Sequence, residues 1–471
     1  MLRKKAFVVA VVPFAAILVA AVITLTAAES PSVALTGLVS AQDEGATAPL
    51  EGVLVSARRA GSTITVTVVS DAHGRYSFPR NRLEPGAYSL RIRAIGYEPE
   101  GPGTVIVTPQ QTAQLDLKLR TSQDLASQLS NGEWFTSWPG SDEVKNGLLN
   151  CTQCHGLEPV ARSRHTASEW VQVLERMGRY AQGSTRTRPQ LRPNAHGGGF
   201  ANPILAQTVG GREGDRPVPQ SRVTRAAEYL STINLSASHT PYPLKTLPRP
   251  TDKATRVIIT EYDLPRPETL PHDAAVDSDG MIWYADFGSH VLGMLDPKTG
   301  NVVEYPLPIT KPGAPVGSLD LVFDKQGNIW MGTMYQGSLA KFDRRTKTFQ
   351  TWGSPKFRER DEARIAMVMP INHDVDGQVW IGGDEEYQVD VKTGEWKAID
   401  YSVGLPKDSR ILRELSSYGV ASDSKNNFYG LNLNGTYIIK VDGKTGQVTP
   451  YATPTPNSGP RRGHMDAQDR L

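Results

Sequence analysis

Short apolar runs separated by turn residues dominate the chain and predict a mainly β protein. Between residues 33 and 120, runs such as TITVTVVS and AYSLRIR recur at a spacing of about ten residues. In the second run Tyr88, Leu90 and Ile92 fall on one face, because successive side chains of a strand alternate between its two faces. Strands of this length and spacing predict an antiparallel β-sandwich over 33–120.

A longer β pattern repeats from residue 255 to residue 471. DSDGMIW, DKQGNIW and DVDGQVW place Trp283, Trp330 and Trp380 at separations of 47 and 50 residues, and DSKNNFY is an altered fourth copy. Each repeat holds about four short strands and two tight turns, as a propeller blade does. The region therefore predicts a partial β-propeller of four blades and the start of a fifth. Because open sheet edges are a hazard, we expect a longer natural protein, with a native open ring as the alternative.

A helical pattern separates the two β regions, between residues 131 and 236. Thr166 followed by Glu169 predicts a capping box, and the periodicity of SRVTRAAEYLSTINL predicts a later helix. The apolar positions on one face of the first helix are Trp170, Leu174, Met177 and Ala181. A small all-α domain over 131–236 is expected, within a multidomain and mainly β chain.

The N-terminus has the composition of an export signal. Residues 1–5 are basic and 6–28 almost wholly apolar, so 1–28 are predicted to be a signal peptide. The apolar stretch also approaches the length of a membrane span, so an uncleaved anchor is the alternative. In either case we expect the remainder to be exported, periplasmic or extracellular. The 51 basic and 49 acidic residues leave a net charge of +2, which indicates no nucleic-acid partner.

The stretch CTQCHG contains the only two cysteines of the chain, Cys151 and Cys154, followed by His155. This C-x-x-C-H spacing is the attachment signature of c-type haem. The two thiols can reach the two vinyl groups on one porphyrin edge, and the next imidazole can bind the iron. The sequence thus predicts one covalent haem c with His155 as iron ligand. The alternatives are a thiol-exchange pair or disulfide and another metal site, although zinc needs four ligands and no second Cys pair exists.

The sixth ligand of the iron has several candidates. Met177 lies on the apolar helix face that would pack on the porphyrin, and a thioether ligand raises the reduction potential. Its alternative role is that of a core methionine. His196, in the loop NAHGGGF, is the second candidate, followed by His165 or an open site. An open site would allow small-ligand or peroxide chemistry.

The first β region resembles a known family through the strings G-x-V, D-x-x-G-x-Y-x-F-P, L-x-P-G-x-Y-x-L and A-x-G-Y. They are carried by Gly37, Asp71, Gly74, Tyr76, Phe78, Leu83, Pro85, Gly86, Tyr88, Leu90, Ala94, Gly96 and Tyr97. Residues 33–120 thereby resemble the carboxypeptidase regulatory-like domain. The resemblance implies a carbohydrate-binding-like fold that usually serves as a non-catalytic scaffold, so we expect a structural or docking module.

Two further resemblances concern the other regions. The run CTQCHGLEPVARSRHTASEWVQVLERM resembles the haem-binding domain of the quinohaemoprotein amine dehydrogenase α subunit, which implies a cytochrome c-like domain. The repeats of 255–471 resemble streptogramin (virginiamycin B) lyase-like propellers and, more distantly, gluconolactonase-like ones, which implies a ring of about seven blades. The catalytic residues of the lyases match no positions of this chain, so lyase activity is an analogy of fold alone.

The propeller repeats contain weaker site candidates. Aligned repeats put one residue of each blade at the start of the innermost strand, where side chains often face the central pocket: His272, Leu319, Met369, Tyr418 and Arg461. His272 with Asp273 is the best candidate for a catalytic or binding site, and a plain turn histidine after Pro271 is the alternative. The supporting residues are expected to be Glu261, Asp320 and His373.

These expectations combine into haem-mediated electron transfer outside the cytoplasm, because the haem alone carries chemistry of its own. A redox partner protein would be required, and the propeller would offer a binding face for a small-molecule substrate or a partner. Two alternatives are a propeller-centred lyase or lactonase with an appended haem, and a non-catalytic sensor or binding protein.

Overall fold

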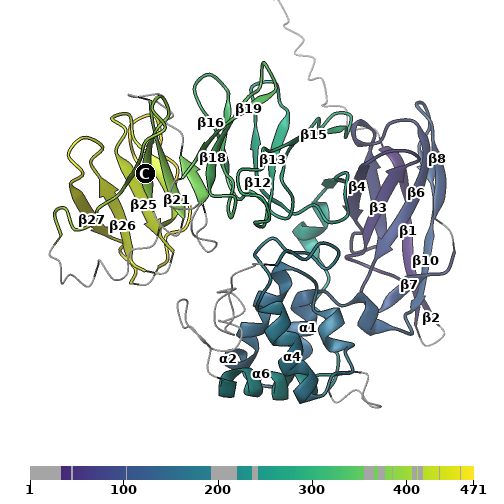
Figure 1. The fold of residues 1–471 in the computed structure, drawn as a ribbon. Coiled ribbons are helices and arrows are strands. Elements are labelled where there is room, and N and C mark those ends of the chain that lie inside the picture. Colours follow the sequence, from purple (N-terminus) through teal and green to yellow (C-terminus); the bar gives the residue numbers. More distant parts are fainter. Residues whose placement is uncertain are drawn as a thin grey trace, which may run out of the picture.

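The computed structural model describes residues 33–471 with the exception of 44–45, 102, 192–219, 236–241, 355–364, 370–376, 384–385, 406–410, 412–416, 434 and 457. The described elements form a two-sheet sandwich, a group of helices and four further sheets in a row (Figure 1). The helices lie beside the junction between the sandwich and the row of sheets. The protein is therefore mainly β and built of several sheets, as the sequence predicts.

The sandwich consists of two sheets that enclose one apolar core. The first sheet contains β1 (Val33–Asp43), β2 (Ala46–Pro49), β5 (Arg75–Pro79), β7 (Tyr97–Pro99), β9 (Ala113–Gln114) and β10 (Leu117–Thr121). The long strand β1 pairs antiparallel with β2 and β5 but parallel with β9 and β10. The expectation of a purely antiparallel sandwich is therefore wrong, because the chain passes through the other sheet before it returns beside β1.

The second sheet has the order β11-β4-β3-β6-β8. Its strands are β3 (Leu54–Arg59), β4 (Ile64–Val69), β6 (Gly86–Arg93), β8 (Thr104–Val107) and β11 (Ile259–Tyr262). Strand β11 comes from the region that the repeat pattern assigned to the propeller, yet it pairs antiparallel with β4. The chain thus returns to the sandwich after the helices and adds an edge strand there. Local sequence could not reveal this pairing, because its partner lies almost 200 residues earlier.

Gly37 lies where three segments of the sandwich meet. A Cβ atom at this position would lie 1.9 Å from the carbonyl oxygen of Leu115 and 2.9 Å from the hydroxyl of Tyr76. The Tyr76 ring is buried, and its hydroxyl donates to the same Leu115 carbonyl at 2.5 Å. Two residues of the family string, Gly37 and Tyr76, therefore serve a single close contact inside the core.

The helical group has its own apolar core. It contains α1 (Asn131–Ser137), α2 (Asp142–Asn146), α3 (Glu158–Ala161), α4 (Ala167–Met177), α6 (Gln220–Thr232) and the 3-10 helix η3 (Gly147–Gln153). The capping box is confirmed, since the Thr166 hydroxyl accepts from the Glu169 N–H and the Glu169 carboxylate accepts from the Thr166 N–H. Trp170 and Leu174 of α4 are buried against α6, as their spacing predicts. Among the described residues, no helix is long and apolar enough to cross a membrane.

The repeats fold into four antiparallel sheets of four strands each. In chain order these are β12 (Pro271–Val276), β13 (Ile282–Asp286), β14 (Val291–Leu295) and β15 (Val302–Pro306); β16 (Leu321–Phe323), β17 (Ile329–Gly332), β18 (Ser338–Asp343) and β19 (Thr348–Gly353); β20 (Ile365–Met369), β21 (Gln378–Gly383), β22 (Tyr387–Asp390) and β23 (Trp396–Ala398); β24 (Ser417–Ser422), β25 (Phe428–Asn432), β26 (Tyr437–Val441) and β27 (Val448–Ala452). The first strands of successive sheets contact one another, as the inner strands of propeller blades do. The four predicted blades are thus present, arranged as an arc (Figure 1).

The Asp-to-Trp repeat has a direct physical explanation. The indole N–H of Trp283 donates to Asp277 at 2.8 Å, and that of Trp330 donates to Asp324 at 2.9 Å. The same Asp side chains accept backbone N–H groups of their own tight turns. Each Asp therefore stabilises its turn and orients the aromatic ring six residues later. The Trp283 ring then packs 5.7 Å from Phe342 of the next blade, which confirms that the repeated aromatic residue fills the space between blades.

We predict that Gly37→Ala destabilises the sandwich by about 2 kcal/mol, because the added methyl group must displace the Leu115 carbonyl. The sandwich contains no tryptophan, so the measurement is hydrogen exchange of β1 and β10 by mass spectrometry. Exchange should become faster in the variant. Gly101→Ala is the matched control, because its added Cβ meets nothing within 4 Å. Equal exchange in the two variants would contradict the close-contact explanation.

Candidate functional site

Cys151 lies in the last turn of η3 and Cys154 is the residue that caps its C-terminal end, at the border of the helical core. Both the Cys154 and His155 N–H groups lie 3.4 Å from the Cys151 carbonyl oxygen, so the C-x-x-C-H stretch forms one tight turn. Both thiols are free and partly buried. Cys151 packs against the apolar core that Trp134 and Leu174 build. The turn thus presents both sulfur atoms from one short segment.

Burial raises the pKa of the Cys151 thiol to about 12, with a further contribution from the neighbouring Cys154. Burial also raises the pKa of Cys154. A thiol-exchange site instead depends on a cysteine whose pKa is lowered by a helix N-terminus or a nearby cation. The surroundings of these two thiols therefore do not resemble those of an exchange site.

The His155 ring follows the turn directly. Its Nδ1 lies 2.7 Å from the carbonyl oxygen of Gly156. Because a carbonyl oxygen only accepts, Nδ1 is the protonated nitrogen, and Nε2 keeps its lone pair. Metal-binding histidines characteristically hold the second ring nitrogen in this way, which sets tautomer and ring orientation. His155 therefore has the hydrogen bonding of an Nε2 ligand.

The sixth-ligand candidates fall in different places. Met177 is the last residue of α4, partly buried, and packs against the same core as Cys151. His165 is exposed beyond the opposite end of α4, with its ring 5.2 Å from that of Trp170. His196 lies outside the described residues. Of the placed candidates, only Met177 shares the core of the cysteine turn.

The helical core also contains donors that the described residues leave without acceptors. The indole N–H groups of Trp134 and Trp170 are buried and find no acceptor in the described part of the chain. Buried donors are nearly always paired, so these two N–H groups are exceptions within the described residues. The two thiols and the oriented imidazole fit a covalently bound haem. Within the described ranges, no group of three or more His, Cys, Asp and Glu side chains is arranged to hold a metal ion by itself.

A polar cluster occupies the inner side of the propeller arc. His272 and Asp273 begin β12, with His272 Nδ1 3.3 Å from the Asp273 carboxylate. Arg462 bonds the same carboxylate and lies 3.4 Å from His272 Nδ1. The structure thus brings Arg462, some 190 residues later, onto the His272–Asp273 pair that the sequence singles out. In the aligned repeats Arg461 corresponds to His272, so Arg462 corresponds to Asp273. This correspondence was the sequence signal that could have indicated Arg462.

Asp273 is held in its charged form. Burial raises its pKa, but hydrogen bonds with His272, Asp320 and Arg462 outweigh this and lower the pKa to about 2. Asp320 therefore belongs to the cluster, as expected. The Arg461 guanidinium donates to the Tyr418 hydroxyl at 2.9 Å and lies over its ring. Two of the aligned repeat positions, Tyr418 and Arg461, therefore contact each other.

Of the remaining predicted members, Glu261 does not join this cluster. Glu261 lies on β11, in the sandwich, because that strand pairs with β4. Its assignment to the propeller site is therefore wrong. His373 lies outside the described residues. The cluster is thus made by His272, Asp273, Asp320 and Arg462, with Tyr418 and Arg461 beside it.

An arm of the helical region, residues 180–191, connects the two candidate sites. The Gln190 side chain donates to the carbonyl oxygens of Gly288 and Val316 and accepts the Val316 N–H at 2.7 Å. Arg188 donates to the Ser289 hydroxyl at 2.7 Å. Gly183, at φ +83°, lies so close to Phe287 that a Cβ would meet the Phe287 carbonyl oxygen at 2.0 Å. Sequence reasoning missed this arm, because none of its residues forms a recognisable motif.

The arm lies close to both candidate sites. Ala181, four residues after Met177, is fully buried in an apolar cluster that also contains Leu319, and Phe287 packs on this cluster. The Phe287 ring in turn lies 5.3 Å from that of His272. The end of α4 and the polar cluster are therefore separated by one short packed connection.

We predict that Gln190→Ala releases the arm from the propeller, because three hydrogen bonds are lost and the Val316 N–H is left without its acceptor. Limited proteolysis should then cut within 180–191 faster than in the wild type. The control is Gln326→Ala, in an exposed propeller turn. An unchanged cleavage rate at the arm in Gln190→Ala would contradict the role of this side chain.

We further predict that Asp273→Asn is less stable than the wild type by about 2 kcal/mol near neutral pH. A carboxylate with a lowered pKa contributes stability above its ordinary pKa, and this is lost as pH falls through the folded-state value. The difference between the two proteins should thus close between pH 3.8 and about 2. Urea unfolding followed by tryptophan fluorescence measures it, with the exposed turn residue Asp279→Asn as control. A difference independent of pH would contradict the ionic role of Asp273.

Comparisons with known proteins give similarities to solved structures and to one domain family. The chain resembles virginiamycin B lyase from Staphylococcus aureus, with 17% identity and a TM-score of 0.34 over 44% of this chain and 63% of that one. It resembles a streptogramin B lyase with 21% identity and a TM-score of 0.35 over 45% of this chain and 64% of that one. The chain thus spans less than two thirds of each. The four sheets are described as blades because of their strand pairing, and not because of these similarities.

No curated protein matches the chain. Residues 34–120 match the carboxypeptidase regulatory-like domain family. These are the residues of β1 to β10, including the Gly37–Tyr76 contact. The sandwich accordingly matches the carboxypeptidase regulatory-like domain family, and β11, from outside the matched range, extends it at one edge.

Proposed function

We propose that the protein carries one covalent haem c in its helical region and transfers electrons outside the cytoplasm. The observation that carries this proposal is the turn at Cys151, Cys154 and His155. It combines two adjacent thiols at the border of an apolar core with an imidazole whose Nδ1 donates to a backbone carbonyl. The apolar N-terminal stretch, expected to direct export, is consistent with the compartment in which such haem attachment takes place.

Cys151 and Cys154 would hold the porphyrin through thioether bonds, and His155 would bind the iron through Nε2. When bound, the haem supplies a one-electron redox couple whose potential depends on the axial ligands. Met177 is the proposed sixth ligand, because it shares the core of the turn. The protein's own contribution is an apolar surrounding, which excludes water.

The propeller would then serve as the binding face for a substrate or a redox partner protein. The arm 180–191 supports this, because its hydrogen bonds hold the helical region against the loops of the first two blades. The sandwich would act as a docking or spacing module. We place the protein in the periplasm or outside the cell on the same reasoning, with no role for nucleic acid.

A second candidate function is an enzyme centred on the propeller. The observation that favours it is the cluster of His272, Asp273, Asp320 and Arg462, in which a charged carboxylate lies beside an imidazole. Such a pair could act in general acid–base chemistry. A lyase or lactonase activity remains an analogy of fold, and a non-catalytic sensor is a third possibility.

We predict that expression with a periplasmic haem-maturation system yields a coloured protein with a haemochrome spectrum and a mass increased by one haem. Cys151→Ala should retain only one thioether bond, which shifts the haemochrome absorbance maximum. Met177→Ala should lose the sulfur–iron absorbance band and lower the reduction potential. The control is Met281→Ala, in the first blade.

A colourless protein of unmodified mass would contradict the proposal. A haem protein whose spectrum and potential do not change in Met177→Ala would leave the haem in place but remove Met177 as its ligand. Turnover of a cyclic ester that persists in Cys151→Ala/Cys154→Ala and is lost in Asp273→Asn would favour the propeller-centred enzyme instead.

A further inference from the structure

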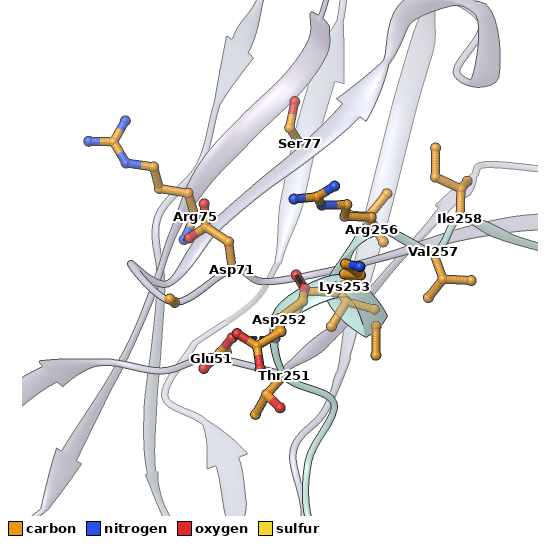
Figure 2. A pocket seen from close by; sticks show the side chains of 15 residues that line it. Glu51, Asp71, Arg75, Ser77, Thr251, Asp252, Lys253, Arg256, Val257 and Ile258 are labelled. Carbon is orange, nitrogen blue, oxygen red and sulfur yellow. Dashed lines mark hydrogen bonds between the residues drawn. The ribbon is translucent and has the colours of Figure 1, made fainter.

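A groove of about 1040 Å³ lies between the sandwich and the connector that leads to β11. One wall is formed by the end of β4 and by β5, with Val68, Val69 and Ser77. The opposite wall is the connector 251–258, which includes the 3-10 helix η4 (Asp252–Arg256) (Figure 2). The groove is separate from both candidate sites described above.

The connector is held at the mouth of the groove by tight contacts. A Cβ at Gly52, where φ is +78°, would lie 2.4 Å from the Pro250 carbonyl oxygen. Arg249 donates to the Glu51 carbonyl at 3.0 Å, and the Asp252 N–H donates to the Glu51 carboxylate at 3.1 Å. Asp252 itself has φ +52°, which is uncommon for a residue other than glycine. The chain therefore turns away from β4 here and leaves the groove open.

Along the groove, one residue at the edge of β4 has no strand partner. Strand β11 pairs with β4 only from Ile64 to Thr67. Ser70 directs its backbone groups toward the β3 side, where its N–H donates to Val53. Because backbone groups alternate between the two edges of a strand, those of Val69 point toward the groove. No described backbone group pairs with them. Val69 is 6% exposed, so its one donor and one acceptor are available only to a chain that enters the groove.

The connector wall adds apolar and cationic side chains. Val257 and Ile258 are 45% and 39% exposed, which is unusual for neighbouring aliphatic residues and typical of an interaction surface. Lys253 and Arg256 have no carboxylate partner in the described part of the chain. Figure 2 shows both on the connector side of the groove, whereas Arg75 extends away from the other labelled side chains.

The carboxylates of the groove are mostly engaged in holding the backbone. Glu51 accepts the Asp252 N–H, and Asp71 accepts the N–H groups of His73 and Arg75 in its turn. The cationic groups of Lys253 and Arg256 lie beside the open strand edge, together with the Asp252 carboxylate, which also lines the groove. An anionic side chain on an extended backbone would complement both features at once.

We propose that this groove binds an extended peptide segment of a partner protein that carries an acidic side chain. The backbone of the segment would form a β-bridge with Val69. Its apolar side chains would cover Val257 and Ile258, and its carboxylate would pair with Arg256 and Lys253. The carboxypeptidase regulatory-like domain thereby becomes a docking module for an acidic strand, whatever group the helical region carries.

The test uses the full chain and a fluorescein-labelled peptide of sequence Thr-Val-Glu-Val-Thr, followed by fluorescence anisotropy. Replacing Glu by Gln in the peptide should weaken binding about tenfold, because a charge-assisted hydrogen bond is lost. Methylating the backbone nitrogens of the peptide should weaken it by a similar factor, because the β-bridge cannot form. In the protein, Arg256→Glu should reproduce the loss, whereas the control Lys118→Glu, at an exposed cation of β10 that does not line the groove, should bind as the wild type does.

Three results would overturn the proposal. The first is binding that does not distinguish the Glu peptide from the Gln peptide. The second is an equal effect of Arg256→Glu and Lys118→Glu, which would indicate attraction by the general surface charge. The third is displacement of the peptide by free glutarate at the peptide's own concentration, which would indicate a simple anion site. Haem content does not enter these measurements, so their outcome is independent of the proposed electron transfer.

Discussion

The contact of Gln190 with the loops of the first two blades determines how the helical region and the propeller are placed relative to each other. A single carboxamide satisfies two carbonyl oxygens and one N–H of the propeller backbone. Such groups are costly to leave unpaired when they are covered. Because Gly183 allows the arm to approach Phe287 directly, no side chain keeps the two surfaces apart. Together with the Arg188–Ser289 hydrogen bond and the buried Ala181, this contact fixes the helical region beside the first two blades.

The return of the chain to the sandwich is a second constraint of the same kind. Strand β11 adds an edge to the second sheet, and its last residue, Tyr262, donates its hydroxyl to the Pro297 carbonyl oxygen in the first blade. Thr63 of the sandwich donates to the Gly300 carbonyl at 2.8 Å. The sandwich thus contacts the outer part of the first blade, while the arm contacts its inner part. The first blade is therefore held from two sides, and the open groove beside β4 is a consequence of how the connector reaches it.

The chemistry of the molecule is concentrated in two small groups of side chains. The cysteine turn has the proposed haem ligands, and the cluster around Asp273 has the propeller's charged carboxylate. They differ in their surroundings, because the first borders an apolar core and the second is a network of ion pairs. The packed series from Ala181 through Phe287 to His272 joins them. An electron-transfer function and a propeller-bound substrate are thus compatible within one architecture.

The sequence by itself determined the features that depend on local spacing. The Asp277-to-Trp283 bond spans six residues, the Thr166 capping box spans three, and the cysteine turn spans four, so each is encoded in one short stretch. Only the tertiary structure decided the pairing of β11 with β4, the hydrogen bonding of Gln190 to the propeller backbone and the bond between Arg462 and Asp273. These contacts join segments that are far apart in the chain. Their formation depends on which distant surfaces are complementary in shape and hydrogen bonding, and no local pattern records that.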